Sequence, residues 1–285
     1  MSDEYAQPKN VIDHYAVLGN PISHSKSPQI HRAFAQQTGQ IISYESTLAP
    51  VDGFAATVDN LIKQGFKGAN VTLPFKIEAF ALCDYLSLRA EAAGAVNTLT
   101  FANGKINGDN TDGVGLVNDI TLNLGINLQG SRILLLGAGG AAQGVLLPLL
   151  NAKPSSITIA NRSLEKAHFM AQKFAANHAI CNIAACNFEK LSAPFLTQPF
   201  DVVINATSAG LTEATLNLSD EIYSPHTLAY DMMYGIETPF MMQAQTRGAQ
   251  VSDGLGMLVE QAAEAFYLWR NVRPETAPII KMMRS

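Results

Sequence analysis

The chain alternates between short apolar segments and longer segments whose apolar residues recur at helical spacing. In its first part we expect strands at 14–18, 41–48 and 67–73, helices at 27–39, 54–64 and 75–82, and two short extended segments near 98–106. Parallel strands need a crossover connection, which is usually a helix. The alternation therefore predicts an α/β fold with parallel strands.

A second unit of the same kind begins near Asp112. Its expected helices lie at 114–124, 141–150 and 164–177, and its expected strands at 132–136, 157–160, 201–205 and 228–232. The segment from Arg132 to Leu136 is almost wholly apolar, which is typical of a strand buried on both faces. Two more helices are expected at 255–270 and 274–283, and periodicity alone lets them pack on either unit.

Composition limits the classes of function. The chain has 285 residues, enough for about two domains. Apolar residues make up 47% and charged residues 15%, which excludes a disordered chain, a collagen and a coiled coil. The 19 basic and 24 acidic residues give a net charge of −5, the wrong sign for a nucleic-acid or anionic-membrane surface. We therefore expect a small-molecule partner, with no nucleic acid and no membrane.

The cysteines and the first residues indicate a cytoplasmic protein. Cys83, Cys181 and Cys186 are too few, and odd in number, for a disulfide framework. Neither they nor the six histidines have metal-ligand spacing, so no metal site is expected. Residues 1–10 carry early acidic side chains and no apolar core, unlike a signal or transit peptide.

The most specific motif joins an expected strand to an expected helix and reads Gly137-Ala138-Gly139-Gly140-Ala141-Ala142. This is the G-x-G-x-x-A form of the dinucleotide fingerprint, in which missing side chains let the backbone approach a pyrophosphate at a helix N-terminus. A glycine-rich turn that only serves tight packing is the alternative. The strand before the motif, the helix after it and the second strand some 20 residues on favour nucleotide binding.

The end of that second strand carries Asn161, Arg162 and Ser163. An acidic residue here would accept a hydrogen bond from the ribose 2′-hydroxyl of NAD, whereas a basic residue accommodates the 2′-phosphate of NADP. Asn161 and Ser163 could instead only cap the next helix, with Arg162 in solvent. Capping and phosphate binding are compatible, so we favour NADP.

Three polar segments follow expected strands. Ser25 and Ser27 precede a helix whose first position is Pro28, so Ser27 is either only the N-cap or, with Ser25, a carboxylate site. Thr72 and Lys76 follow a strand end, where α/β proteins bind ligands, although a lone lysine is more often a solvated charge. Asp112 is most simply a turn residue that caps the following helix.

Together these segments resemble the shikimate dehydrogenases of aromatic amino-acid biosynthesis. The resemblance runs nearly end to end and rests on GNPISHSKSP at 19–28, NVTLPFK at 70–76, GAVNTL at 94–99, GDNTDG at 108–113, LLGAGGAA at 135–142, NRS at 161–163, NATSAG at 205–210, YDMMYG at 230–235 and DGLGMLVEQAAEAF at 253–266. It implies the reversible, NADPH-dependent reduction of 3-dehydroshikimate to shikimate.

The resemblance also assigns roles to single residues. Lys76 and Asp112 would form the catalytic pair. The substrate would be bound by Ser25 and Ser27 at its carboxylate, and around its ring by Thr72, Asn97, Tyr234 and Gln261. The cofactor would be bound by Gly137, Ala138, Gly139, Gly140 and Ala141 at the pyrophosphate, by Asn161, Arg162 and Ser163 at the 2′-phosphate, and by Met232 and Gly254 beside the nicotinamide.

From this resemblance we expect two α/β domains with the active site in the cleft between them. Residues 1–111 and 251–285 would form the substrate-binding domain, 112–250 the Rossmann-type NADP-binding domain, and the protein would be a monomer or homodimer. Two positions depart from the family. Ala142-Gln143 replaces a Ser-Arg pair that many members carry, which would remove one basic contact to the cofactor, and Leu88 stands where some members have an acidic residue.

Two alternatives remain at this point. A quinate/shikimate dehydrogenase that uses NAD is disfavoured by Arg162, which stands where an acidic residue is expected for NAD. A nucleotide-binding module without catalysis is disfavoured by the presence of both Lys76 and Asp112.

Overall fold

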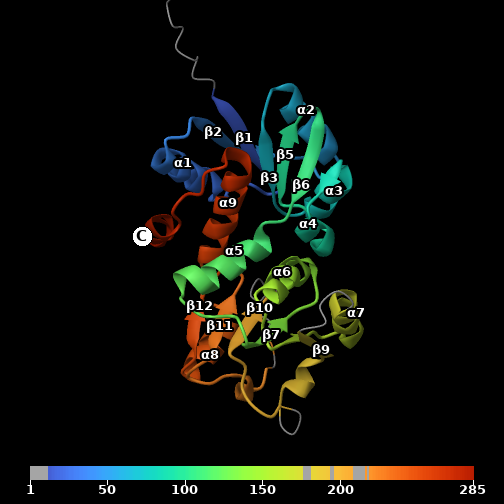
Figure 1. Cartoon of the computed structure of the whole chain (residues 1–285), viewed down its shortest axis with the longest axis vertical. Helices are drawn as coiled ribbons and strands as arrows, with labels where there is room; N and C mark the ends of the chain where they lie inside the picture. The colour runs from blue at the N-terminus through green and yellow to red at the C-terminus, as the bar shows by residue number, and fades with distance from the viewer. Residues whose placement is uncertain (1–11, 176–180, 193–195, 208–215, 217) are drawn as a thin grey trace, which may run out of the picture.

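Two six-stranded sheets lie at opposite ends of an elongated molecule (Figure 1). The structure, a computed structural model, describes residues 12–175, 181–192, 196–207, 216 and 218–285. Each sheet is covered by helices, so the expected fold class of two α/β domains is confirmed. No helix in the described part of the chain combines the length and apolar character needed to cross a membrane.

The first sheet has the strand order β2-β1-β3-β5-β6-β4. Its strands are β1 (Asp13–Gly19), β2 (Ile42–Leu48), β3 (Gly68–Val71), β4 (Tyr85–Leu86), β5 (Thr98–Ala102) and β6 (Lys105–Asp109). The expected strands β1, β2 and β3 are parallel, whereas β5 runs antiparallel to both of its neighbours and makes this sheet mixed. The reason lies in Asn103 and Gly104, whose φ angles of 53° and 69° form a tight hairpin turn between β5 and β6.

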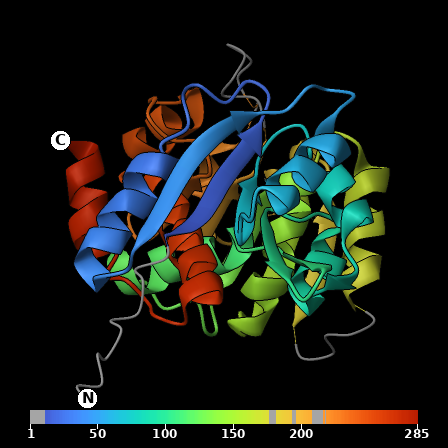
Figure 2. The ribbon, with the colours of Figure 1, turned by 90° about the horizontal axis from the view of Figure 1, so that it is seen from above.

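Helices cover the two faces of this sheet from different parts of the chain. α2 (Phe54–Lys63) and α3 (Lys76–Leu82) lie on one side of β1 and β2, and α1 (Ser27–Thr38) lies on the other (Figure 2). α1 buries Ile30 and Phe34 against the last two helices, α9 (Leu255–Arg270) and α10 (Ala277–Arg284). The end of the chain therefore returns to the sheet formed by its beginning.

The second sheet is wholly parallel and has the strand order β12-β11-β10-β7-β8-β9. Its strands are β7 (Arg132–Leu136), β8 (Ser156–Ala160), β9 (Asn182–Cys186), β10 (Val202–Asn205), β11 (Leu228–Asp231) and β12 (Gln250–Ser252). This is the 3-2-1-4-5-6 order of the Rossmann fold. Ile133 of β7 packs in one core and Leu134 in another, so this strand is buried on both faces as expected.

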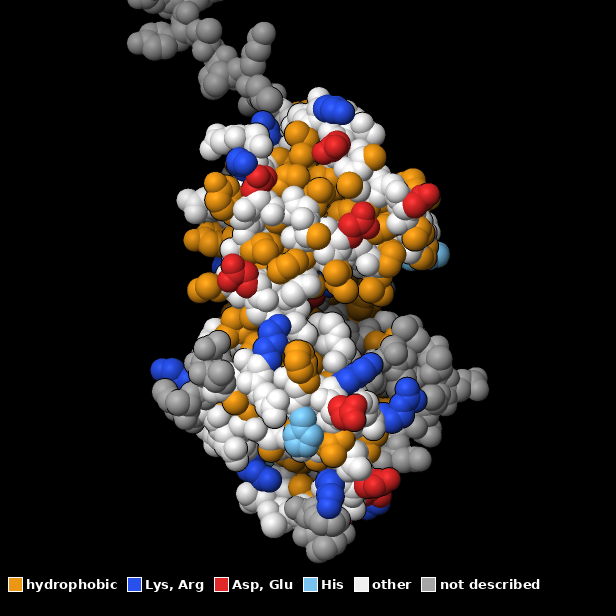
Figure 3. Space-filling model, turned by 90° about the vertical axis from the view of Figure 1, so that its right-hand side faces the viewer, with side chains coloured by type: hydrophobic (Ala, Val, Ile, Leu, Met, Phe, Trp, Pro, Cys, Tyr) orange, Lys and Arg blue, Asp and Glu red, His pale blue; other side chains and the backbone are white. Residues whose placement is uncertain are grey.

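Helices also flank this second sheet. They are α6 (Gly140–Asn151), α7 (Leu164–Ala175) and α8 (Pro239–Thr246), with short helical turns at η2 (Phe188–Leu191) and η4 (Asp220–Ile222). The expected helix at 164–177 is confirmed to Ala175, and its last two positions lie outside the described residues. In the space-filling view the outline narrows between the two halves, and basic side chains are scattered over the lower half (Figure 3).

α5 (Asp112–Asn118) joins the two halves and packs between α6 and α9. Its glycines make this possible. A Cβ on Gly113 would lie 2.7 Å from the Gly144 carbonyl oxygen of α6, and one on Gly115 would lie 2.8 Å from the Met257 carbonyl oxygen of α9. The expected helix at 114–124 thus begins two residues earlier, and it continues from Asp119 to Asn123 as a π-helical turn.

Several short elements escaped prediction. They are β4, α4 (Leu88–Ala93), β9, α8 and β12. None exceeds eight residues, and β4 and β9 are half-exposed strands at sheet edges. Such elements lack the continuous apolar run or the long helical period on which the prediction depends.

Candidate active site

Lys76 and Asp112 form an ion pair between the first turns of two helices. α3 begins at Lys76, α5 begins at Asp112, and Lys76 Nζ lies 2.6 Å from Asp112 Oδ2. The two side chains are 28% and 17% exposed. The N-cap of α5 is Thr111, so the interpretation of Asp112 as a helix cap is wrong. Because an ammonium group has three N–H donors, Lys76 can bind Asp112 and a small molecule together.

Asn97 connects this ion pair to the C-terminal part of the chain. Its side chain is buried, and Nδ2 donates to Asp112 Oδ1 at 2.8 Å and to Gln261 Oε1 on α9 at 3.2 Å. The Gln261 amide donates in turn to the Leu258 carbonyl oxygen at 3.1 Å. The structure therefore brings four of the predicted site residues together: Lys76, Asn97, Asp112 and Gln261.

Two buried residues that were not among the predicted site residues hold Asp112 in place. Asn110 Oδ1 accepts from the Asp112 backbone N–H at 3.1 Å, while Asn110 Nδ2 donates to the Ala95 carbonyl oxygen at 3.0 Å. The Thr111 backbone N–H donates to Asn97 Oδ1 at 2.9 Å. The run of four polar residues at 109–112 could have indicated these two residues, but the same run is also typical of a simple turn.

The two serines lie at the start of α1, although neither caps it. The N-cap position is Lys26, without a side-chain cap, and Ser27 is the first residue of the helix. The interpretation of Ser27 as the N-cap is therefore wrong. Instead the Ser27 backbone N–H donates to Ser25 Oγ at 3.3 Å, and Ser27 itself is buried. Neither serine is the N-cap of α1, so the role of the two hydroxyl groups in binding a ligand stays a prediction.

Thr72 lies beside the loop that carries these serines. Its backbone N–H donates to the Leu18 carbonyl oxygen at 2.9 Å. A Cβ on Gly19 would approach the Thr72 methyl group to 2.5 Å, so only glycine fits at the end of β1. The carboxyl ends of β1 and β3 therefore lie in contact, which is the usual position of ligands in α/β sheets.

Met232 and Gly254 meet beyond the ends of β11 and β12. A Cβ on Gly254 would lie 2.3 Å from the Met232 carbonyl oxygen, and the Gly254 N–H donates to the Met233 carbonyl oxygen at 2.7 Å. Tyr234 lies on the same loop, where partial burial raises the pKa of its phenol. The structure does not bring Tyr234 into the hydrogen bonds that join the described residues Lys76, Asn97, Asp112 and Gln261.

The glycine-rich turn between β7 and α6 has the backbone of a phosphate cradle. Gly137 has a φ of 107°, a conformation that favours glycine. A Cβ on Gly139 or Gly140 would meet no atom within 4 Å, so the outer side of the turn is open. α6 begins at Gly140 and presents its free backbone N–H groups there. The turn therefore fits the pyrophosphate of a dinucleotide.

The residues after β8 lie beside this turn. Asn161 Nδ2 donates to the Ser163 carbonyl oxygen at 2.9 Å, and Arg162 is exposed in the turn so formed. Sequence reasoning missed Lys166, which follows Arg162 by four positions on a segment that enters α7. Helical spacing does not relate the two residues, because Arg162 precedes α7, and no other sequence signal marked Lys166.

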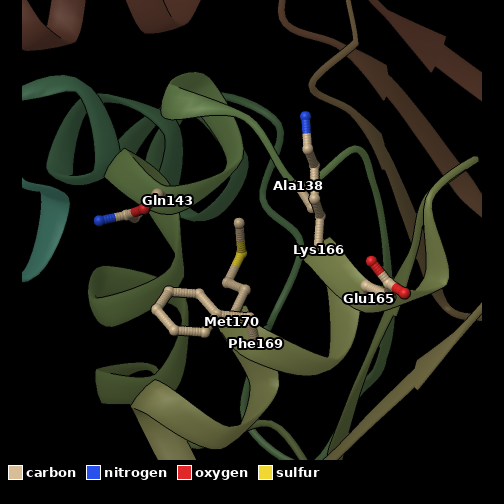
Figure 4. Close-up of a pocket in the computed structure, with 6 residues that line it drawn as sticks. All are labelled: Ala138, Gln143, Glu165, Lys166, Phe169 and Met170. Carbon is tan, nitrogen blue, oxygen red and sulfur yellow. The ribbon is translucent and has the colours of Figure 1, made fainter.

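A pocket of about 290 Å³ lies between α6 and α7, next to the glycine-rich turn. It is lined by Ala138, Gln143, Glu165, Lys166, Phe169 and Met170 (Figure 4). In the close-up Lys166 stands beside Ala138, whereas Gln143 extends away from it. Lys166 is therefore a second cation beside the glycine-rich turn, in addition to Arg162, which is expected to bind phosphate.

Gln143, one of the two departures from the family pattern, binds α4. Its amide donates to the Ala92 carbonyl oxygen at 3.1 Å, which also accepts from Lys173 Nζ of α7 at 3.0 Å. The position thus links the second half of the molecule to the first. Leu88, the other departure, is 79% exposed at the start of α4.

Three family models match successive parts of the chain. Residues 17–99 match the shikimate dehydrogenase substrate binding domain, residues 120–232 match shikimate / quinate 5-dehydrogenase, and residues 254–284 match the shikimate 5′-dehydrogenase C-terminal domain. The matches follow the chain in the order of the first sheet, the second sheet and the terminal helices.

Individual proteins agree with these matches. The chain is 56% identical to the shikimate dehydrogenase (NADP(+)) of Methylobacillus flagellatus, over 96% of this chain and 100% of that one. An Ael1 enzyme from Pseudomonas putida has a TM-score of 0.89 at 46% identity, covering 95% of this chain and 97% of that one. The shikimate 5-dehydrogenase of Thermus thermophilus, in complex with NADP(H) and shikimate, has a TM-score of 0.83 at 32% identity, covering 96% and 99%. The chain belongs to the shikimate/quinate dehydrogenase family.

Proposed function

We propose that this chain is an NADP-dependent shikimate dehydrogenase, which catalyses the reversible reduction of 3-dehydroshikimate to shikimate. The observation that carries the proposal is the Lys76–Asp112 pair, 2.6 Å apart and open to a ligand. It is supported by the relatives, which are named as NADP(+) enzymes. The reaction belongs to the biosynthesis of aromatic amino acids.

The proposed substrate site extends from the serines to the ion pair. Ser25 and Ser27 would donate hydroxyl hydrogen bonds to the substrate carboxylate, which the dipole of α1 also attracts. Thr72, Asn97, Gln261 and Tyr234 would bind the ring and its oxygens. Fixing the ring at both ends holds the reacting carbon in one orientation, and such positioning alone lowers the barrier of a two-reactant step.

The proposed chemistry uses Lys76 as the proton donor. During reduction the ring carbonyl oxygen gains negative charge, and the Lys76 ammonium stabilises that charge and donates a proton to the oxygen. In the reverse direction the lysine accepts the proton. Asp112 orients the ammonium through Oδ2 and accepts a hydrogen bond from a neighbouring ring hydroxyl.

NADPH supplies the hydride in this reaction. Gly137, Ala138, Gly139, Gly140 and Ala141 would hold its pyrophosphate. Asn161, Arg162 and Ser163, together with Lys166, would hold the adenosine 2′-phosphate, and Met232 and Gly254 would lie at the nicotinamide. The open turn at Gly139 and Gly140 supports this assignment.

The domain division is part of the proposal. We assign 1–111 and the terminal helices to the substrate domain, because α9 and α10 pack on α1. The Rossmann domain would run from 112 to 252 rather than 250, because β12 ends at Ser252. The active site would occupy the cleft between the two. A cytoplasmic location is supported by three free cysteines, and we propose a monomer or homodimer.

One assay tests the function. Reduction of the nicotinamide is followed by absorbance with shikimate or quinate, each offered with NADP or NAD. We expect turnover with shikimate and NADP to exceed every other combination. Preferred use of quinate with NAD would instead support the quinate/shikimate dehydrogenase, and no turnover with any combination would support a binding module without catalysis.

A further inference from the structure

A fully buried carboxylate lies at the carboxyl end of β11, directly before the loop that the proposed function places beside the nicotinamide. This residue is Asp231. Its Oδ2 accepts from Asn205 Nδ2 at 3.0 Å and from Thr238 Oγ1 at 2.7 Å, and its Oδ1 accepts from the Met233 backbone N–H at 2.9 Å. Because a buried carboxylate is costly unless it is hydrogen-bonded, these three donors fix its position.

The bond to Met233 holds the backbone of the nicotinamide loop. While the Met233 N–H donates to Asp231, its carbonyl oxygen accepts from the Gly254 N–H at 2.7 Å. The preceding residue, Met232, donates its N–H to the Asn205 carbonyl oxygen at 3.0 Å. Since Met232 and Gly254 are the residues assigned to the nicotinamide, Asp231 holds the backbone that forms this side of the cofactor site.

The other side of Asp231 is fixed by the amide of Asn205, which ends the neighbouring strand β10. Asn205 Oδ1 accepts from the Thr207 backbone N–H at 3.1 Å and from Thr207 Oγ1 at 2.7 Å. An amide oxygen that accepts these two bonds leaves only the amide nitrogen for Asp231, and that nitrogen can only donate. Position 231 must therefore offer an acceptor towards Asn205 and a second acceptor towards Met233.

The position of Asp231 in the sheet separates it from the residues assigned to the adenosine half of the cofactor. In the order β12-β11-β10-β7-β8-β9, β11 lies on one side of β7 and β8 lies on the other. Arg162 follows β8, and the glycine-rich turn follows β7. A loop that is held in its binding conformation loses less freedom when a ligand binds. Loosening the backbone at Met233 should thus weaken contacts to the nicotinamide and spare those to the 2′-phosphate.

We propose that Asp231 is a positioning residue for the nicotinamide half of the cofactor, acting through the backbone of Met233. The inference rests on the proposed function, since it needs NADPH in the assigned site. It makes Asp231 a determinant of nicotinamide binding, not of 2′-phosphate recognition or of proton transfer at Lys76.

The test is calorimetric titration of wild type and Asp231→Asn with two probes, NADPH and 2′-phospho-ADP-ribose, which lacks the nicotinamide ring. The new side chain has one acceptor oxygen, so it can serve either the two side-chain donors or the Met233 N–H, but not both. The Kd of NADPH should rise roughly tenfold, which corresponds to about 1.4 kcal/mol. The Kd of 2′-phospho-ADP-ribose should change less than about twofold, because the residues that bind it lie apart from Asp231.

Three further variants separate positioning from folding. Asp201→Asn is the matched control, because Asp201 also accepts from a backbone N–H, that of Arg132 at 2.7 Å, but is exposed before the start of β10. It should leave both Kd values unchanged. Thr238→Val removes one donor to Asp231 and should raise the Kd of NADPH roughly threefold. Thr238→Ser keeps the hydroxyl group and should retain the wild-type Kd, so this pair provides the test if Asp231→Asn does not fold.

The outcomes distinguish this inference from the function on which it rests. The titrations contain no shikimate, so wild-type protein that binds NADPH but does not turn over shikimate would overturn the proposed function alone. An unchanged Kd of NADPH in Asp231→Asn, or an equal rise for both probes, would overturn the role of Asp231. The same follows if Thr238→Val binds NADPH as tightly as Thr238→Ser does.

Discussion

Asn97 Nδ2 and Gln261 Oε1 lie 3.2 Å apart although 164 positions separate the two residues in the chain. Asn97 precedes β5 of the first sheet, whereas Gln261 belongs to α9, which follows the whole second sheet. The proposed substrate site is therefore complete only when α9 packs against α1 and α5. This arrangement ties assembly of the site to assembly of both halves of the molecule.

Lys76→Met should separate catalysis from binding. The change keeps the aliphatic stem and removes the ammonium, so we expect kcat to fall by roughly 10²–10⁴-fold, the range for one acid–base group. The KM for shikimate should move far less, because the charge on the oxygen develops mainly in the transition state. Steady-state kinetics with shikimate and NADP measure both parameters.

Lys105→Met is the control for this change, because Lys105 also pairs with an aspartate, Asp84, at 2.7 Å but lies on the exposed hairpin end of β6. It should leave kcat unchanged.

Asp112→Asn should lower kcat and raise the KM for shikimate together. If the pair acts as a unit, the free-energy loss in the Lys76→Met/Asp112→Asn double mutant should be smaller than the sum of the losses in the two single mutants. Near-normal kcat in Lys76→Met would mean that Lys76 is only the ion-pair partner of Asp112 and has no catalytic role.

Arg162→Ala should weaken NADP without weakening NAD. A charge-assisted hydrogen bond contributes about 1.5–3 kcal/mol, so NADP should bind roughly ten- to a hundredfold more weakly. Lys166→Ala should act in the same direction, since Lys166 lines the pocket beside the glycine-rich turn. Titration of each variant with NADP and with NAD measures the selectivity.

Lys63→Ala, at an exposed position of α2 in the other half of the molecule, should change neither affinity. Equal losses for NADP and NAD in Arg162→Ala would mean that Arg162 supports the pyrophosphate or the fold instead of the 2′-phosphate.

Ser27→Ala and Ser25→Ala should raise the KM for shikimate and leave the KM for NADP unchanged. Little stability should be lost with Ser27, because its hydroxyl does not cap α1. Ser87 is the matched control, since it does cap a helix: its side chain accepts from the Ala90 backbone N–H at 3.2 Å. Ser87→Ala should lower the free energy of unfolding by about 1 kcal/mol and leave the KM unchanged. A loss of stability in Ser27→Ala with an unchanged KM for shikimate would mean that Ser27 has only a structural role.

The sequence predicted the fold where the local pattern and the tertiary environment agree. The apolar segment at β7 is buried on both faces, and the glycines after it leave an open turn, so strand and motif could be recognised together. Ser27 shows the opposite case. Its position before Pro28 suggested an N-cap, but Lys26 holds that position and Ser27 is already the first residue of the helix.

Contacts between distant elements could not be predicted either, because the local pattern of residues does not show which elements pack together. Tyr44 and Asn70 lie in strands, His31 lies in a helix, and none belongs to a pattern that marks a polar cluster. The Tyr44 phenol donates to Asn70 Oδ1 at 2.7 Å, and His31 stacks on the Tyr44 ring. The strands β2 and β3 lie on either side of β1, and α1 packs over this part of the sheet. Only this arrangement brings the three side chains together. Polar residues inside a core become informative only once their partners are known.

The pH dependence of stability should report the burial of His31. Burial lowers its folded-state pKa to about 3, whereas the unfolded chain has the ordinary value near 6.5. Below pH 6.5 the unfolded state therefore binds a proton that the folded state does not. Stability from this group is fully present above that pH and is lost as the pH falls towards 3.

His31→Phe removes the titrating group and keeps an aromatic ring against Tyr44. Between pH 7 and pH 5 the wild-type protein should lose about 2 kcal/mol more of its free energy of unfolding than this variant does. Urea unfolding at the two pH values measures the difference, and His226→Gln, at an exposed position, serves as the control. Equal losses in wild type and His31→Phe would mean that His31 can accept a proton in the folded protein, so the stack on Tyr44 would have to accommodate a charged ring.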